Sequence, residues 1–274
     1  MMVQMEETST IAETLRNVLF FGGLVAAALI RAHHQKNPPD KTALTQTMAG
    51  RSWKTVQVAT LIAALFLLYF AAGCTGQFFY EEQLPAAKLA ITLIIYAILI
   101  GIIAVINRIR GENWKLNLGM GFRNISKLLL APAIYLAIIP FMMLISKGWH
   151  LLLEQLFASE VGLQDVAEMV SGHLSWLEIC YILVAIFVAP VYEELIFRGI
   201  IFPYFVKRAG LKAAMALVSG IFAVMHFHLP SFVPLALLSS ALCLAYWRTG
   251  SLWVSIGIHM LFNAVSILAL NIST

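Results

Sequence analysis

Charged and polar side chains interrupt the apolar stretches in the C-terminal third of the chain. Two acids, Glu193 and Glu194, stand together there, and Arg198 follows four residues after the second. Residues four apart share one face of a helix, so we expect Glu194 and Arg198 to form an ion pair. Glu193 should point about 100° away from that pair. Arg198 alone could be an anchor at the membrane surface, but its spacing from Glu194 favours a role in supporting a site.

Two further pairs repeat this spacing later in the chain. Phe222 precedes His226 by four residues, and His259 precedes Asn263 by four. Counted from the nearest basic loop residue at about 1.5 Å per residue, Glu193 and His226 lie ~21 Å along their helices and His259 ~16 Å. A single buried histidine is more often a contact between helices. Ionisable groups at similar depth on three helices instead favour one shared site, because each costs roughly a few kcal/mol at membrane depth.

These residue types together suit the attack of water on an amide. A carboxylate can act as general base, and a neutral histidine facing it can hold and polarise a water molecule. A second histidine with an asparagine supplies donors for a developing oxyanion. Nucleophilic catalysis fits less well, because the sequence has no Gly-x-Ser-x-Gly elbow and no cysteine beside a histidine. A His-Glu-x-x-His zinc motif is also absent from the sequence.

The composition excludes a soluble globular protein as the carrier of this site. Of the 274 residues, 61% are hydrophobic and 12% are charged, whereas soluble domains have about 45–50% and about 25%. Disorder, collagen and coiled coil also need repeats or charge patterns that this chain lacks. Only helices and closed barrels satisfy the backbone in hydrocarbon, and the apolar runs lack the alternation of barrel strands. The sequence therefore predicts an all-α fold, a polytopic membrane helix bundle.

We expect about eight transmembrane helices, the first of them short for a span. The apolar runs cover 18–30, 56–73, 89–106, 128–145, 177–205, 213–228, 232–247 and 252–270. Three regions follow from this pattern. Residues 1–146 hold accessory helices, residues 147–175 form an extracytoplasmic or interfacial helical loop, and residues 176–274 form the catalytic core.

The loops between these runs alternate in charge. Segments 31–55 and 107–127, the residues just after 205, and Arg248 are basic, whereas 74–88 and 146–176 are mainly acidic. Basic loops collect in the cytoplasm, which places both termini outside. The net charge of +4 is therefore attributed to basic residues in cytoplasmic loops and not to a nucleic-acid site. We expect a multi-pass protein of the cell membrane, with the lipid bilayer and no nucleic acid as partner. The isolated cysteines, Cys74, Cys180 and Cys243, are expected to be small buried hydrophobes.

Three motifs, taken in order, resemble those of a known family. The chain is similar to the CPBP family of intramembrane glutamate proteases, which includes the type II CAAX prenyl endopeptidases and the bacteriocin-immunity-like (Abi) proteins. The resemblance covers residues 176–271, about a third of the chain. It rests on Glu193-Glu194-x-x-x-Arg198, Phe222-x-x-x-His226 and His259-x-x-x-Asn263.

The resemblance implies a role for each motif residue. Glu193 would be the general base, supported by Glu194 and Arg198, and His226 would help to activate the water. It implies that the chain is an endopeptidase acting on a peptide or protein substrate at the membrane. Prenylated CAAX peptides are the substrates of eukaryotic members, and the resemblance does not carry the substrate over to this chain.

In the same way, His259 and Asn263 would stabilise the oxyanion, and Phe222 would shape the substrate pocket. No cofactor is expected, although zinc is possible. Its ligands would then be Glu193, His226 and His259. Position 263 is an asparagine and not a third histidine, so the set has only two histidines and a carboxylate.

Two other classes of function remain open. One is a non-enzymatic membrane protein of the bacteriocin-immunity kind, which would tolerate Glu193→Gln. The other is a proton-coupled transporter, which predicts inverted repeats and polar groups in both halves of the membrane domain. Only the second half of this chain carries acidic, basic or histidine residues inside its apolar runs.

Overall fold

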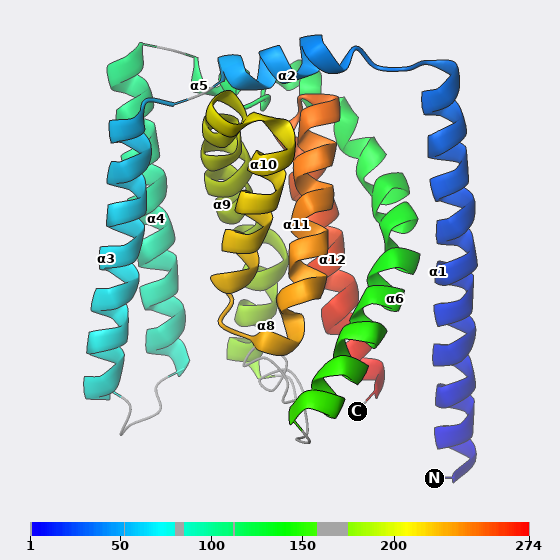
Figure 1. Cartoon of the computed structure of the whole chain (residues 1–274). Helices are drawn as coiled ribbons and strands as arrows, with labels where there is room; N and C mark the ends of the chain where they lie inside the picture. Colours follow the sequence, from blue (N-terminus) through cyan, green and yellow to red (C-terminus); the bar gives the residue numbers. More distant parts are fainter. Residues whose placement is uncertain (1, 52, 80–84, 112, 158–174, 274) are drawn as a thin grey trace.

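The computed structural model describes residues 2–51, 53–79, 85–111, 113–157 and 175–273, and all regular elements in these ranges are helices (Figure 1). They are the α-helices α1 (Met2–Lys36), α2 (Lys41–Gly50), α3 (Thr55–Phe79), α4 (Pro85–Arg110), α5 (Trp114–Asn117), α6 (Ala131–Phe157), α8 (Trp176–Leu183), α9 (Ala189–Ile196), α10 (Phe202–Val224), α11 (Leu229–Thr249) and α12 (Leu252–Ser273). The 3-10 helix η2 (Phe122–Leu130) and the π-helices η3 (Val184–Val188) and η4 (Phe197–Ile201) complete them. The expected polytopic helical bundle is confirmed.

Six helical segments of the described chain are long and apolar enough to cross a membrane, and a seventh counts if α2 and α3, bent by 70°, form one span. One of the six, Trp176–Val224, has 49 residues and contains two of the expected spans. The chain turns within it at Gly210, whose φ of +79° breaks the helical backbone. Glycine suits this position because it adopts positive φ without a steric penalty. The short run 18–30 belongs to a longer candidate span, Glu13–Lys36.

Helix α2 lies across one end of the upright helices, and both termini lie at the opposite end (Figure 1). Asp40 begins α2 by accepting hydrogen bonds from the backbone N–H groups of Thr42 and Ala43, at 2.9 and 3.0 Å. The basic loops of the sequence meet at this end. Arg51 donates to the carbonyl of Gly250 at 3.0 Å, which ties the segment after α2 to the turn between α11 and α12. That the basic end is cytoplasmic stays a prediction.

The core lies where α6 and α9 to α12 meet. Phe202, Leu238, Leu242 and Tyr246 are completely buried there, whereas apolar side chains such as Phe66 are exposed on the outer surface. Such an outer surface suits a protein whose solvent is lipid. The hairpin of α3 and α4 stands at one side of this core, and α1 stands at the other (Figure 1).

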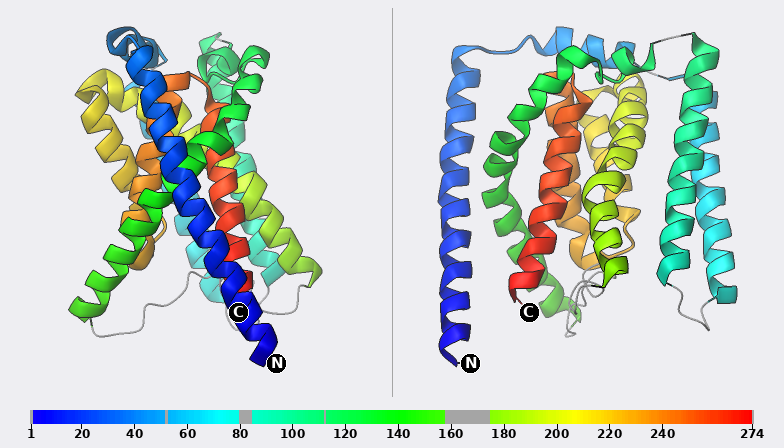
Figure 2. Two further views of the ribbon diagram at one scale, coloured as in Figure 1. Left: turned by 90° about the vertical axis from the view of Figure 1, so that its right-hand side faces the viewer. Right: turned by 180° about the vertical axis from the view of Figure 1, so that it is seen from behind.

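Helix α1 crosses α6 at a glycine (Figure 2). A Cβ atom on Gly23 would lie 2.5 Å from the carbonyl oxygen of Leu136 and 2.5 Å from Cδ of Pro140. Small residues at such crossings let two membrane helices approach closely. The first helix is therefore packed against the bundle.

Two expectations about individual segments differ from the structure. Helix α6 continues to Phe157, so residues 147–157 are its last turns and the chain does not start a separate element at 147. Residues 158–174, the rest of the expected interfacial helix, lie outside the described residues. The span expected over 128–145 begins in the 3-10 helix η2 and extends twelve residues further, because apolar side chains continue through Leu151–Leu153.

Cys243 is buried, Cys180 is partly buried, and both are free thiols. The side chain of Cys74 lies outside the described residues.

Candidate active site

Two π-helical segments frame the acidic pair. Glu193 and Glu194 lie on α9, with η3 before it and η4, which carries Arg198, after it. Pro190 is the second residue of α9, in the first turn, where its missing N–H removes little from the helix. A π turn inserts an extra residue into the helix and is frequent at functional sites. These turns set which way the side chains of α9 face.

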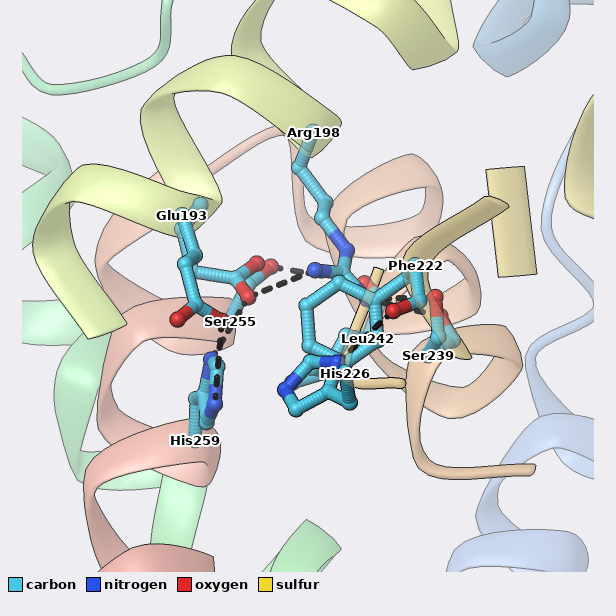
Figure 3. A network of polar contacts seen from close by, with 9 residues as sticks. Glu193, Arg198, Phe222, His226, Ser239, Leu242, Ser255 and His259 are labelled. Carbon is cyan, nitrogen blue, oxygen red and sulfur yellow. Dashed lines mark hydrogen bonds and ion pairs between the residues drawn. The ribbon is translucent and has the colours of Figure 1, made fainter. Parts of the chain in front are cut away.

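An ion pair inside the bundle holds the second glutamate. Nη1 of Arg198 lies 2.8 Å from Oε1 of Glu194, and both side chains are completely buried. Nη2 of Arg198 donates to Oγ of Ser239 at 2.7 Å and to the Ser239 carbonyl at 3.2 Å (Figure 3). The guanidinium also lies over the Phe222 ring, 4.6 Å from its centroid. The pairing expected from the i, i+4 spacing is therefore present, and a residue of α11 completes it.

His259 of α12 joins the two glutamates. Its Nδ1 lies 2.9 Å from Oε1 of Glu194, and its Nε2 lies 3.8 Å from Oε2 of Glu193 (Figure 3). In a neutral imidazole one nitrogen donates and the other accepts. Because Nδ1 faces a carboxylate, it is the donor, which leaves Nε2 as an acceptor on the side of Glu193. In acyl-transfer sites, a buried carboxylate that accepts from Nδ1 of a histidine holds the imidazole in one tautomer and one orientation.

His226 reaches the same region from the end of α10. Its Nδ1 lies 2.8 Å from the carbonyl oxygen of Phe222, so Nδ1 donates and Nε2 is free to accept. The Phe222 ring lies 4.8 Å from the His226 ring and 5.7 Å from the His259 ring. Both imidazoles therefore border one phenyl ring, beside the carboxylate of Glu193 (Figure 3). The structure brings together residues from α9, α10 and α12.

Asn263 lies one turn beyond His259 and has a different contact. Its Nδ2 donates to the carbonyl of Ala185 in η3 at 2.7 Å. A π-helical segment leaves some of its carbonyl groups without the usual helical partner, and Asn263 satisfies one of them. This bond fixes α12 against the helix that carries Glu193, and the second N–H of the amide remains available.

Several buried polar atoms of the site have no hydrogen-bond partner within the described part of the chain. They are Oε2 of Glu193, Oε2 of Glu194 and Nε of Arg198. Buried polar atoms are almost always paired, with protein or with ordered water. The unpaired oxygen of Glu193 is thus a place for a water molecule to bind.

The residues expected to hold a metal ion, if one binds, are Glu193, His226 and His259. Within the described residues, no three histidine, cysteine, aspartate or glutamate side chains are grouped in a way that could hold a metal ion. Nδ1 of His259 is already used by Glu194.

The sequence reasoning missed two kinds of residue at this site. Ser239 accepts from Arg198, and the pair of serines Ser239 and Ser240 inside the apolar run 232–247 was a signal that could have found it. Tyr192 precedes the acidic pair and stacks on Tyr96 of α4. No spacing within the sequence links these two tyrosines.

Comparison with known proteins gives one match. Residues 175–265 match the family model described as type II CAAX prenyl endopeptidase Rce1-like. The match covers about a third of the chain, and in this region the chain is similar to the type II CAAX prenyl endopeptidases. The matched region runs from the start of α8 into α12, and it includes all seven residues of the three motifs. No curated protein and no solved structure matches the chain.

Proposed function

We propose that the chain is an intramembrane endopeptidase in which Glu193 activates a water molecule for attack on a peptide bond. The observation that carries this proposal is the position of Glu193. Its carboxylate has one unpaired, buried oxygen and lies beside two imidazoles, each with an acceptor nitrogen left after its other contact. A water molecule that donates to Glu193 and to an imidazole is held and polarised for attack.

The reaction then balances as a hydrolysis. The water oxygen bonds to the carbonyl carbon while Glu193 takes its proton. The negative charge develops on the carbonyl oxygen, where the second N–H of Asn263 acts as a donor. His259 acts as a second donor in its imidazolium form, in which Nε2 has taken a proton from solvent while Nδ1 stays bonded to Glu194, and His226 is then the imidazole that holds the water with Glu193. When the carbon–nitrogen bond breaks, the proton passes to the leaving amine, and Glu193 returns to its starting state.

Glu194 and Arg198 support this chemistry without taking part in it. Arg198 compensates the charge of Glu194, and Glu194 orients His259 through Nδ1. Breaking a buried pair by removal of one partner leaves an uncompensated charge and is strongly destabilising. The network therefore holds α9, α11 and α12 in one arrangement around Glu193.

The proposed substrate is a membrane-associated peptide of the prenylated, CAAX-like kind. A shallow, open apolar groove of about 460 Å³ lies along α10, on the face that carries the exposed side chains of Leu217, Ile221 and Val224. We propose that a lipid chain attached to the peptide lies in this groove, which is also lined by Ala216, Gly220 and Met225. We propose the cell membrane as the location of the enzyme, with its basic end in the cytoplasm and no nucleic acid as partner.

We propose that no metal or other cofactor is needed. Purified chain in lipid nanodiscs is expected to cleave an internally quenched peptide that ends in a farnesylated CAAX sequence, at a rate that a chelator leaves unchanged. Fluorescence gives the rate and mass spectrometry identifies the bond. Activity that is lost with chelator and restored by added Zn²⁺ would instead assign the site to a metalloenzyme.

The same assay separates the proposal from the two other classes. A non-enzymatic immunity-like protein would cleave no peptide, and its phenotype in cells would survive Glu193→Gln. A transporter would also cleave nothing, and its Glu193→Gln variant would lose proton-coupled uptake.

A further inference from the structure

The buried ion pair of the site is made through one oxygen and one nitrogen. Nη1 of Arg198 lies 2.8 Å from Oε1 of Glu194, whereas Oε2 of Glu194 has no hydrogen-bond partner among the residues that the structure describes. Arginine and a carboxylate frequently pair through two parallel hydrogen bonds, which is the stronger arrangement. A further contact is therefore needed to hold the guanidinium in this one-bond arrangement.

Ser239 of α11 supplies that contact. Nη2 of Arg198 donates to Oγ of Ser239 at 2.7 Å and to the carbonyl oxygen of the same residue at 3.2 Å (Figure 3). The serine is completely buried and belongs to none of the three motifs. Nη2 is one of the nitrogens that a two-bond pairing with Glu194 would use, and Ser239 already occupies it.

The one-bond arrangement leaves Glu194 able to serve His259. Oε1 of Glu194 accepts from Nη1 of Arg198 and also from Nδ1 of His259, at 2.9 Å. If the guanidinium turned to take both carboxylate oxygens, the carboxylate would turn with it and its contact with His259 would lengthen. The guanidinium also lies over the Phe222 ring, which borders both imidazoles of the site. A change at Ser239 thus reaches the imidazoles through Arg198.

We propose that Ser239 is a positioning residue for the hydrolytic site. By holding Nη2 of Arg198, it keeps the buried pair in the one-bond arrangement, so that Glu194 holds His259 in a single orientation. Ser239 itself touches neither the substrate nor the attacking water. The inference rests on the proposed endopeptidase function, and it makes α11, which carries no motif residue, part of the catalytic arrangement.

The variants Ser239→Ala and Ser239→Cys test the proposal by kinetics. Alanine removes the hydroxyl, and cysteine replaces it by a group of similar size that accepts only weakly. In the nanodisc assay with the farnesylated CAAX peptide, each is expected to lower kcat by about ten- to a hundredfold, because a small misplacement of a catalytic group has an effect of this size. We expect KM to change by less than about twofold. The backbone carbonyl at position 239 still accepts from Arg198, so both variants should fold.

Ser240→Ala is the matched control. Ser240 is the next residue of α11, and its hydroxyl donates to Oγ of Ser219 on α10 at 2.9 Å. The substitution therefore removes a hydrogen bond between helices without removing the contact with Arg198, and it should keep the parent kcat. Equal losses of kcat in Ser240→Ala and Ser239→Ala would overturn the proposal, because they would show a general effect of helix packing.

Nuclear magnetic resonance separates this inference from the proposed function. In a chain labelled with ¹⁵N at its histidines, the Nδ1 proton of His259 should give a downfield signal, because it is bonded to a carboxylate, and the signal should be absent in His259→Gln. Both Ser239 variants should shift this signal, whereas Ser240→Ala should leave it in place. An unchanged kcat, or an unchanged signal, in both Ser239 variants would overturn the positioning role. If the parent chain cleaves no peptide but the signal still shifts, the endopeptidase proposal fails and the control of His259 by Ser239 stands.

Discussion

Replacing Glu193 by glutamine is expected to lower the rate of peptide cleavage by about 10²- to 10⁴-fold, the usual contribution of a general base. Glutamine has nearly the same shape as glutamate, but its amide cannot take a proton from water. The structure predicts little change in stability. Among the residues that the structure describes, Oε2 of Glu193 has no hydrogen-bond partner, and its 3.8 Å approach to His259 is longer than a hydrogen bond. The measurements are the cleavage rate and the thermal unfolding temperature of the purified variant.

Glu154→Gln supplies the control for this substitution. Glu154 is an exposed acid near the end of α6, so its amide variant changes the charge of the chain equally but should keep the parent rate. Full activity of the Glu193→Gln variant would show that another group accepts the proton of the water.

Arg198→Ala is expected to have the largest effect on stability, a loss of about 3–5 kcal/mol. Alanine leaves the carboxylate of Glu194 buried without its partner and removes the bonds to Ser239. It also frees His259, whose orientation depends on Glu194. Thermal unfolding in detergent or nanodiscs measures the first effect, and the cleavage assay should show a loss of activity even at temperatures where the variant remains folded.

A second ion pair of the chain gives the comparison. Arg16 and Glu13 lie 3.5 Å apart with side chains 60% and 66% exposed, and such a surface pair contributes about 0–1 kcal/mol. Arg16→Ala should therefore unfold close to the parent temperature. The double variant Glu194→Leu with Arg198→Met removes both buried charges, so it should recover much of the stability and none of the activity. Equal unfolding temperatures for Arg198→Ala and Arg16→Ala would contradict the role given to the buried pair.

The spacing rules of the sequence account for the arrangement within each helix. The four-residue interval between Glu194 and Arg198 predicted their contact, because neighbouring turns of one helix fix it locally. The apolar runs likewise predicted the bundle, since hydrocarbon leaves the backbone few alternatives to a helix. The similar depths of Glu193, His226 and His259 indicated one site.

Contacts between distant helices were not predictable in this way. Two serines inside the apolar run 232–247 mark a polar position, but their partner cannot be read from the sequence. Ser239 meets Arg198 and Tyr96 meets Tyr192 because of how the helices rotate and cross. The π turns η3 and η4 each insert an extra residue into the helix. Side chains after each turn therefore point in a different direction from the one that regular α-helical spacing predicts. For the same reason the contact of Asn263 with Ala185 could not be read from its spacing to His259.

An experimental structure of the chain in lipid, at a resolution that shows ordered water, tests the central claim most directly. We expect a water molecule within hydrogen-bond distance of Oε2 of Glu193, with an imidazole nitrogen of His226 or His259 as its second partner. A Glu193 side chain turned toward lipid, or a dry carboxylate far from both imidazoles, would contradict the hydrolytic site described above.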